Sequence, residues 1–78
     1  MKIKNKKQLV KVADAVRLLH ADATWMWVSK IGQVHLSRFK PLEDPTFGWV
    51  GINADTVCMS LIDLKIPVAD TLVQLNGN

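Results

Sequence analysis

The sequence predicts an α+β domain: an N-terminal amphipathic helix packed on an antiparallel sheet of three or four strands, followed by one or two short C-terminal helical segments. Three observations lead to this class. An apolar repeat of helical period covers residues 5–21, a segment rich in β-branched and aromatic residues and a segment that alternates apolar and polar residues flank a glycine turn, and a further tryptophan-bearing segment follows. With 78 residues, the chain is expected to form one domain, 1–78, with one small core.

The first predicted element is a helix that begins after Asn5 and runs to about Ala21. Asn5 is a good N-cap, and Gln8, three residues later, can bond back to the Asn5 amide as in a capping box. One side of this helix carries a buried apolar stripe. Its predicted members are Leu9, Val12, Ala13, Val16, Leu19 and Ala23. Lys7, Lys11, Asp14 and Arg17 are expected to face water.

The middle of the chain predicts a β-hairpin and a third strand. The segment 24–29 reads TWMWVS, a turn with Gly32 at a positive φ follows, and 34–40 alternates as VHLSRFK up to Pro41. Residues 41–45 are interpreted as a connection. Residues 47–52, FGWVGI, supply the third strand, in which Gly48 and Gly51 indicate a bulge or a close backbone approach.

The last third of the chain has two interpretations. Asn53 can cap a helix over the following apolar residues, or the run VCMSLIDLKI can form a fourth strand that ends before Pro67. The helix is slightly favoured. After Pro67, the segment VADTLVQLNGN predicts a short helix with Val68, Leu72 and Leu75 on one side and a stop at Gly77.

Charge is distributed unevenly along the chain. Residues 1–40 hold nine of the ten Lys and Arg residues and two of the seven acids, whereas residues 41–78 hold Lys65 and five acids. The two parts therefore carry net charges of +7 and −4. Such a bipolar molecule would attract an acidic protein face, a nucleic-acid backbone or a second copy of itself.

Size, cysteine content and hydropathy limit the other options. A chain this short buries only about 60% of its unfolded surface, and its single cysteine excludes an intramolecular disulfide. Oligomerisation or docking to a partner is therefore expected as a supplement. No apolar run approaches the roughly 20 residues of a membrane span, and the basic start leads into an amphipathic helix instead of a signal-peptide core. The sequence thus predicts a cytoplasmic protein.

No residue pattern indicates catalysis, a metal or a cofactor. A nucleophilic site requires a base beside the nucleophile, and the candidates are Cys58 with His20 or His35. Cys58 lies in an apolar run typical of an inert thiol. The same three residues lie too far apart in sequence for the usual paired spacing of zinc ligands. We expect a protein that is not an enzyme and holds no cofactor.

The tryptophans are the most informative residues. Trp25 and Trp27 share one face of their strand, with Met26 and Val28 on the other. Both faces are apolar, so this strand is either covered on both sides or contacts a partner. Together with Trp49 and Phe47, they would form an aromatic patch on the face away from the first helix, rimmed by Arg38 and Lys40. Burial of the tryptophans in the core is the alternative.

The central segment resembles small accessory proteins of tailed bacteriophages. The resemblance covers about residues 25–49 and rests on the order of a tryptophan-led strand, a glycine turn, a second strand, a Lys-Pro pair and another tryptophan strand, here WMWVSKIGQVHLSRFKP and FGWVG. It implies an inhibitor-type binding module that acts on a host enzyme or defence complex. The glycine turn differs from the pattern, because SKIGQ lacks an acidic-glycine pair.

These observations predict a non-enzymatic protein-binding module, acting as a dimer or on a larger protein by steric blocking. The predicted contact residues are Trp25, Trp27, Trp49, Arg38 and Lys40, with Lys6, Lys7 and Lys11 adding electrostatic attraction. Two alternatives stay open. A basic surface with aromatics can bind single-stranded nucleic acid, and an oligomer can place a small-molecule site at its interface.

Overall fold

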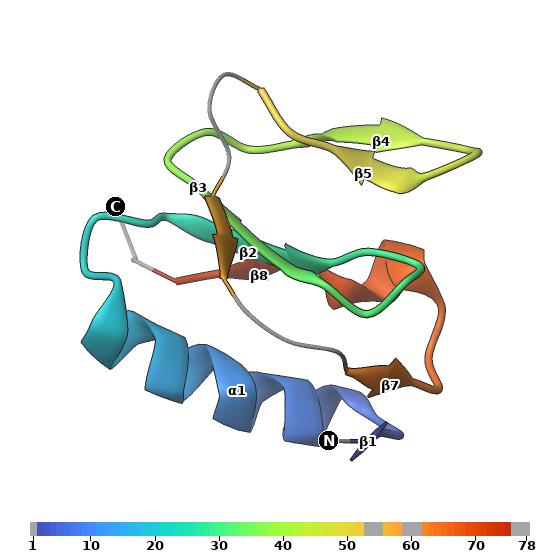
Figure 1. Ribbon diagram of the computed structural model, residues 1–78, viewed down its shortest axis with the longest axis horizontal. Helices are drawn as coiled ribbons and strands as arrows, with labels where there is room; N and C mark the ends of the chain where they lie inside the picture. Colours follow the sequence, from blue (N-terminus) through green and yellow to red (C-terminus); the bar gives the residue numbers. More distant parts are fainter. Residues whose placement is uncertain (1, 53–55, 59–61, 76–78) are drawn as a thin grey trace.

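The computed structural model describes residues 2–52, 56–58 and 62–75. A four-stranded antiparallel sheet, in the order β6-β3-β2-β8, lies between a helix and a separate two-stranded hairpin. Figure 1 shows α1 (Lys6–Leu19) below the sheet and the hairpin of β4 (Leu42–Asp44) and β5 (Gly48–Val50) above it. The predicted α+β class is confirmed. Among the described residues, no helix has the length and apolar character required to cross a membrane.

The start of α1 matches the predicted cap. The Asn5 side chain accepts a hydrogen bond from the Gln8 amide at 3.0 Å. Gln8 in turn accepts from the backbone amide of Lys4, one residue before the amide that the capping box predicts. The two side chains thus satisfy free amides at the helix start, where no intrahelical acceptor exists.

The end of α1 differs slightly from the prediction. The helix ends at Leu19, and His20 caps it by donating its backbone amide to the Val16 carbonyl at 2.8 Å. Leu9, Ala13 and Val16 are buried as expected. Leu19 is largely exposed, contrary to its predicted place in the stripe. Because the helix ends at this residue, no further turn holds it against the sheet.

The predicted hairpin is present as β2 (Trp25–Val28) and β3 (Val34–Ser37), in antiparallel register. Its turn contains Gly32 at φ +85°, a conformation that glycine adopts without strain. A Cβ at this position would lie 2.1 Å from the carbonyl oxygen of Ile62. The turn therefore needs glycine both for its backbone angle and for the close approach of the segment at Ile62.

The predicted third strand is present, but the prediction that it joins the sheet of the first two strands is wrong. Residues 48–50 form β5, which pairs with β4 in a hairpin separate from the main sheet, although 41–45 were interpreted as a connection. Two local features favour this hairpin. An Asp44 carboxylate oxygen accepts the amides of Thr46 and Phe47 at 2.8 and 2.9 Å, and Gly48 has φ +87°. Both shape a tight turn that returns the chain onto β4.

The prediction of a helix after Asn53 is wrong for residues 56–58, which the structure describes. Residues 56–58 form β6 (Thr56–Cys58), antiparallel to β3, as the alternative interpretation predicted. Pairing with the free edge of β3 supplies backbone partners that outweigh the weak helical pattern. The proposed cap, Asn53, and the proposed stop, Gly77, lie outside the described residues.

The C-terminal segment is only partly helical. β7 (Asp63–Leu64) pairs in parallel with β1 (Lys2–Ile3), a 3-10 turn η1 (Val68–Thr71) follows, and β8 (Val73–Gln74) then joins the edge of β2. The buried Thr71 hydroxyl accepts the Val28 amide at 3.0 Å and donates to the Val68 carbonyl at 2.7 Å. This contact ends the helical turn and aligns the chain with β2.

The main core lies between α1 and the lower face of the sheet. Met26 and Val28 project from β2 into the same buried cluster as Leu9 and Ala13 of α1. Trp27 is absent from this cluster because alternate residues of a strand point to opposite faces. The sequence prediction of which β2 residues face the helix is confirmed.

Candidate binding groove

Trp27 lies on the sheet face opposite α1 and forms the floor of a groove. Its ring stacks on His35, with 5.6 Å between centroids and 7° between planes. The two residues are direct cross-strand partners on β2 and β3, which places their side chains side by side. Trp27 is only 2% exposed. The expectation that it is an exposed contact residue is therefore wrong, because the β4–β5 hairpin covers it.

Trp49 positions the hairpin above this floor. Its indole Nε1 donates to the Val68 carbonyl at 3.1 Å, which ties β5 to η1. The hairpin leaves a groove of about 480 Å³ between itself and the β2–β3 turn. The accessible surface of its lining is mostly apolar, although four of the ten described lining residues are polar or charged. The lining residues are Trp27, Ser29, Lys30, Ile31, Gln33, His35, Phe47, Trp49, Val50 and Gly51.

Large apolar side chains remain exposed at the edge of this groove. Ile31 in the β2–β3 turn is 68% exposed, and Phe47 at the tip of the hairpin is 64% exposed. Single exposed apolar residues are common on proteins, but several around one concave surface are typical of a contact site. The groove thus combines fixed aromatic walls with an accessible apolar rim.

The structure separates the other predicted contact residues from the groove. Trp25 is half-buried on the same sheet face as Trp27, at the other end of β2, with Lys40 Nζ 5.6 Å from its ring centroid. Arg38 is exposed and lines a different cavity, of about 390 Å³, beside the connection from α1 to β2. The predicted patch is therefore divided: Trp27 and Trp49 line the groove, whereas Trp25 lies outside it beside Lys40.

The predicted contact lysines of α1 differ in what they contact. Lys6 Nζ donates to the carbonyls of Asp70 and Leu72 at 2.7 and 3.1 Å, so it joins α1 to the C-terminal segment. Lys7 and Lys11 are exposed. Lys6 thus has a structural contact that the sequence did not indicate, whereas the other two have the solvent exposure that electrostatic attraction requires.

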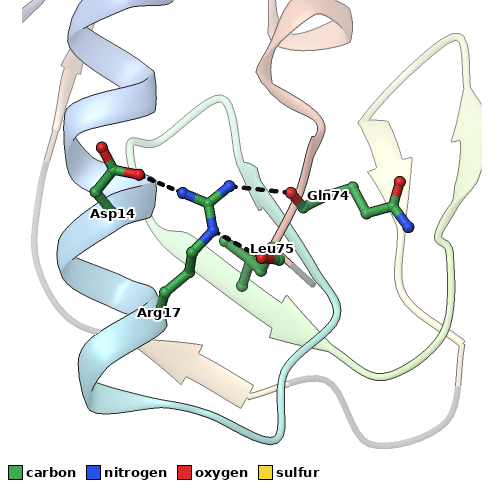
Figure 2. Close-up of polar contacts among 4 residues, drawn as sticks. All are labelled: Asp14, Arg17, Gln74 and Leu75. Carbon is green, nitrogen blue, oxygen red and sulfur yellow. Dashed lines mark hydrogen bonds and ion pairs between the residues drawn. The ribbon is translucent and has the colours of Figure 1, made fainter. Parts of the chain in front are cut away.

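Arg17 has a role that the sequence analysis missed. Figure 2 shows its guanidinium between Asp14 and the last strand: Nε donates to the Leu75 carbonyl at 2.7 Å and a terminal nitrogen donates to the Gln74 carbonyl at 3.2 Å. The other terminal nitrogen pairs with Asp14. Nothing local predicts this, because residues 17 and 75 approach only in the folded chain.

Several groove residues were not predicted as contact residues, among them Lys30, Ile31 and His35. Ile31 had a recognisable signal, since a large aliphatic residue in a polar glycine turn is exposed unless a partner covers it. His35 had none, because its alternation with Val34 and Leu36 fixes its face but does not indicate its stacking partner. Phe47 was expected beside Trp49, and both line the groove.

The candidate catalytic residues lie on three elements. His20 caps α1, His35 on β3 stacks on Trp27, and Cys58 is the β6 partner of Val34, the residue before His35. Within residues 2–52, 56–58 and 62–75, no group of three or more His, Cys, Asp or Glu side chains is placed to hold a metal ion. Comparison of the chain with family models, curated proteins and solved structures found no match.

Proposed function

We propose that this protein is a non-enzymatic protein-binding module and that the groove between the β2–β3 turn and the β4–β5 hairpin is its contact surface. The observation that supports this proposal is the exposure of Ile31 and Phe47 around a hollow floored by Trp27. Covering a large apolar side chain is worth about 1.5–3 kcal/mol. Two such residues beside fixed aromatic walls have the composition of a binding hot spot.

The surroundings of the tryptophans favour a protein partner over single-stranded nucleic acid. Base stacking requires accessible ring faces next to cations. Trp27 is buried against His35, and one face of Trp25 is already occupied by Lys40. Failure to bind single-stranded DNA or RNA at about 50 mM salt, where phosphate contacts are strong, would agree with this preference.

The mechanism of such a module is steric. The bound protein loses access to the surface that the groove covers, and no bond in it is made or broken. An inhibitor of a host enzyme, as the resemblance to phage accessory proteins implies, would act in this way. A second copy of the chain is the other protein partner considered, and light scattering would reveal it as a doubled mass.

The proposal is tested by comparing capture of proteins from a bacterial lysate by three chains. Phe47→Ser removes an exposed groove residue, and Leu18→Ser makes the same kind of change at an 87% exposed residue of α1. A protein captured by the wild type and by Leu18→Ser, and lost with Phe47→Ser, is the expected result. Equal capture by all three chains would exclude the groove as the contact surface. Circular dichroism verifies that both variants are folded.

A further inference from the structure

The described lining of the groove has a single type of permanent charge. Among the lining residues within 2–52, 56–58 and 62–75, Lys30 carries the positive charge and none is a carboxylate. Lys30 is exposed and has no ion-pair partner among the described residues. A group bound in the groove would therefore have a free ammonium at its side.

The acids of the covering hairpin do not cancel this charge within the groove. Asp44 is held in its own turn, where one carboxylate oxygen accepts the amides of Thr46 and Phe47. Glu43 is paired with Trp49 across the hairpin but does not line the groove. A partner residue that enters beside Lys30 thus meets apolar surface and a cation.

The size of the groove restricts what enters it. Its volume of about 480 Å³ lies in the lower half of the range of small-ligand pockets, about 300–1,000 Å³. This suits one or two side chains of a peptide segment, with the rest of the partner outside. Arrangements of this kind, an anchor in a pocket and charges at the rim, are common in peptide recognition.

We propose that the groove binds an acidic peptide segment of the partner protein, which inserts one large apolar side chain between Trp49 and Ile31 and places a carboxylate against Lys30. This inference rests on the proposed function and specifies the partner's chemistry. The apolar anchor supplies most of the affinity. The carboxylate makes the groove specific for acidic segments among those that carry a suitable apolar side chain. It also speeds association, as charges at the rim of an interface do.

The test is selection of random 12-residue peptides displayed on phage against the immobilised full chain at low salt. The expected result is a set of peptides that share a Phe, Leu, Trp or Met residue next to Asp or Glu and that no longer bind Phe47→Ser. For a synthetic member of this set, Lys30→Glu should weaken binding about three- to tenfold at low salt, and the difference should shrink at high salt. Lys7→Glu, the same charge reversal on α1, should leave binding unchanged.

The other outcomes separate the two proposals. Groove-dependent peptides that lack acids, or that bind Lys30→Glu as tightly as the wild type, would overturn the acidic partner and leave the proposed function intact. Selected peptides that bind Phe47→Ser unchanged, or a selection without any shared sequence, would count against the groove itself and hence against both.

Discussion

Replacing Arg17 by Met should weaken the attachment of the last strand to the helix. Methionine keeps an unbranched apolar side chain but cannot donate to the carbonyls of Leu75 and Gln74, which Arg17 contacts at 2.7 and 3.2 Å. Hydrogen bonds from charged donors contribute about 1.5–3 kcal/mol each. The Arg17 side chain is 35% exposed, and its bond to the Gln74 carbonyl is the longer of the two. Solvent therefore reduces the contribution of this bond to the unfolding free energy. Leu75 is 5% exposed, so the loss is concentrated at its carbonyl.

The expected loss is about 2–3 kcal/mol of unfolding free energy. For a domain of this size each kcal/mol lowers Tm by about 4–8 °C, so a fall of about 10–20 °C is expected. Urea and thermal unfolding followed by circular dichroism measure it. Asp14→Asn is the matched control, since it removes only an exposed pair worth about 0.5 kcal/mol or less. A Tm for Arg17→Met within about 2 °C of the wild type would refute the reasoning.

Three further predictions concern the core and the turn. Gly32→Ala should cost more than about 2 kcal/mol, because it combines a positive φ with a Cβ placed 2.1 Å from the Ile62 carbonyl oxygen; a urea midpoint close to that of the wild type would contradict the close approach. Thr71→Val should cost about 1–3 kcal/mol in thermal unfolding, since it leaves the buried Val28 amide without its acceptor at 3.0 Å; an unchanged Tm would mean that another group replaces the hydroxyl. The Trp27 share of the fluorescence, taken as the difference between the wild type and a folded Trp27→Phe variant, should resist quenching by acrylamide, because Trp27 is 2% exposed; quenching of this share as fast as that of free tryptophan would place the ring at the surface.

The candidate site was predictable only in part. The alternation within residues 25–28 was sufficient to place Trp27 on the face away from α1, and the aromatic partners Trp49 and Phe47 were expected there. The burial of Trp27 was not predictable, because it depends on where the hairpin of residues 42–50 folds back. Arg38 and Lys40 were expected at the rim of one patch, yet they lie outside the groove, because the groove adjoins the β2–β3 turn and these residues follow the opposite end of β3.

The sequence by itself determined the features that depend on neighbours within a few residues. Asn5 and Gln8 start the helix, Gly32 closes the hairpin turn, and residues 25–28 alternate between the two faces of the sheet. Caps, turns and the period of a strand are local, so the residues that cause them are adjacent in the chain.

Only the tertiary structure decided which distant segments pair. In the folded chain, residues 56–58 pair with β3, and the hairpin of residues 42–50 forms a sheet separate from the main one. Arg17 contacts the carbonyl of Leu75. A short strand or an arginine is compatible with many partners, and the choice depends on burying the most apolar surface while every buried backbone group finds a hydrogen bond. That balance is a property of the whole chain, which is why the groove appears only once the chain has folded.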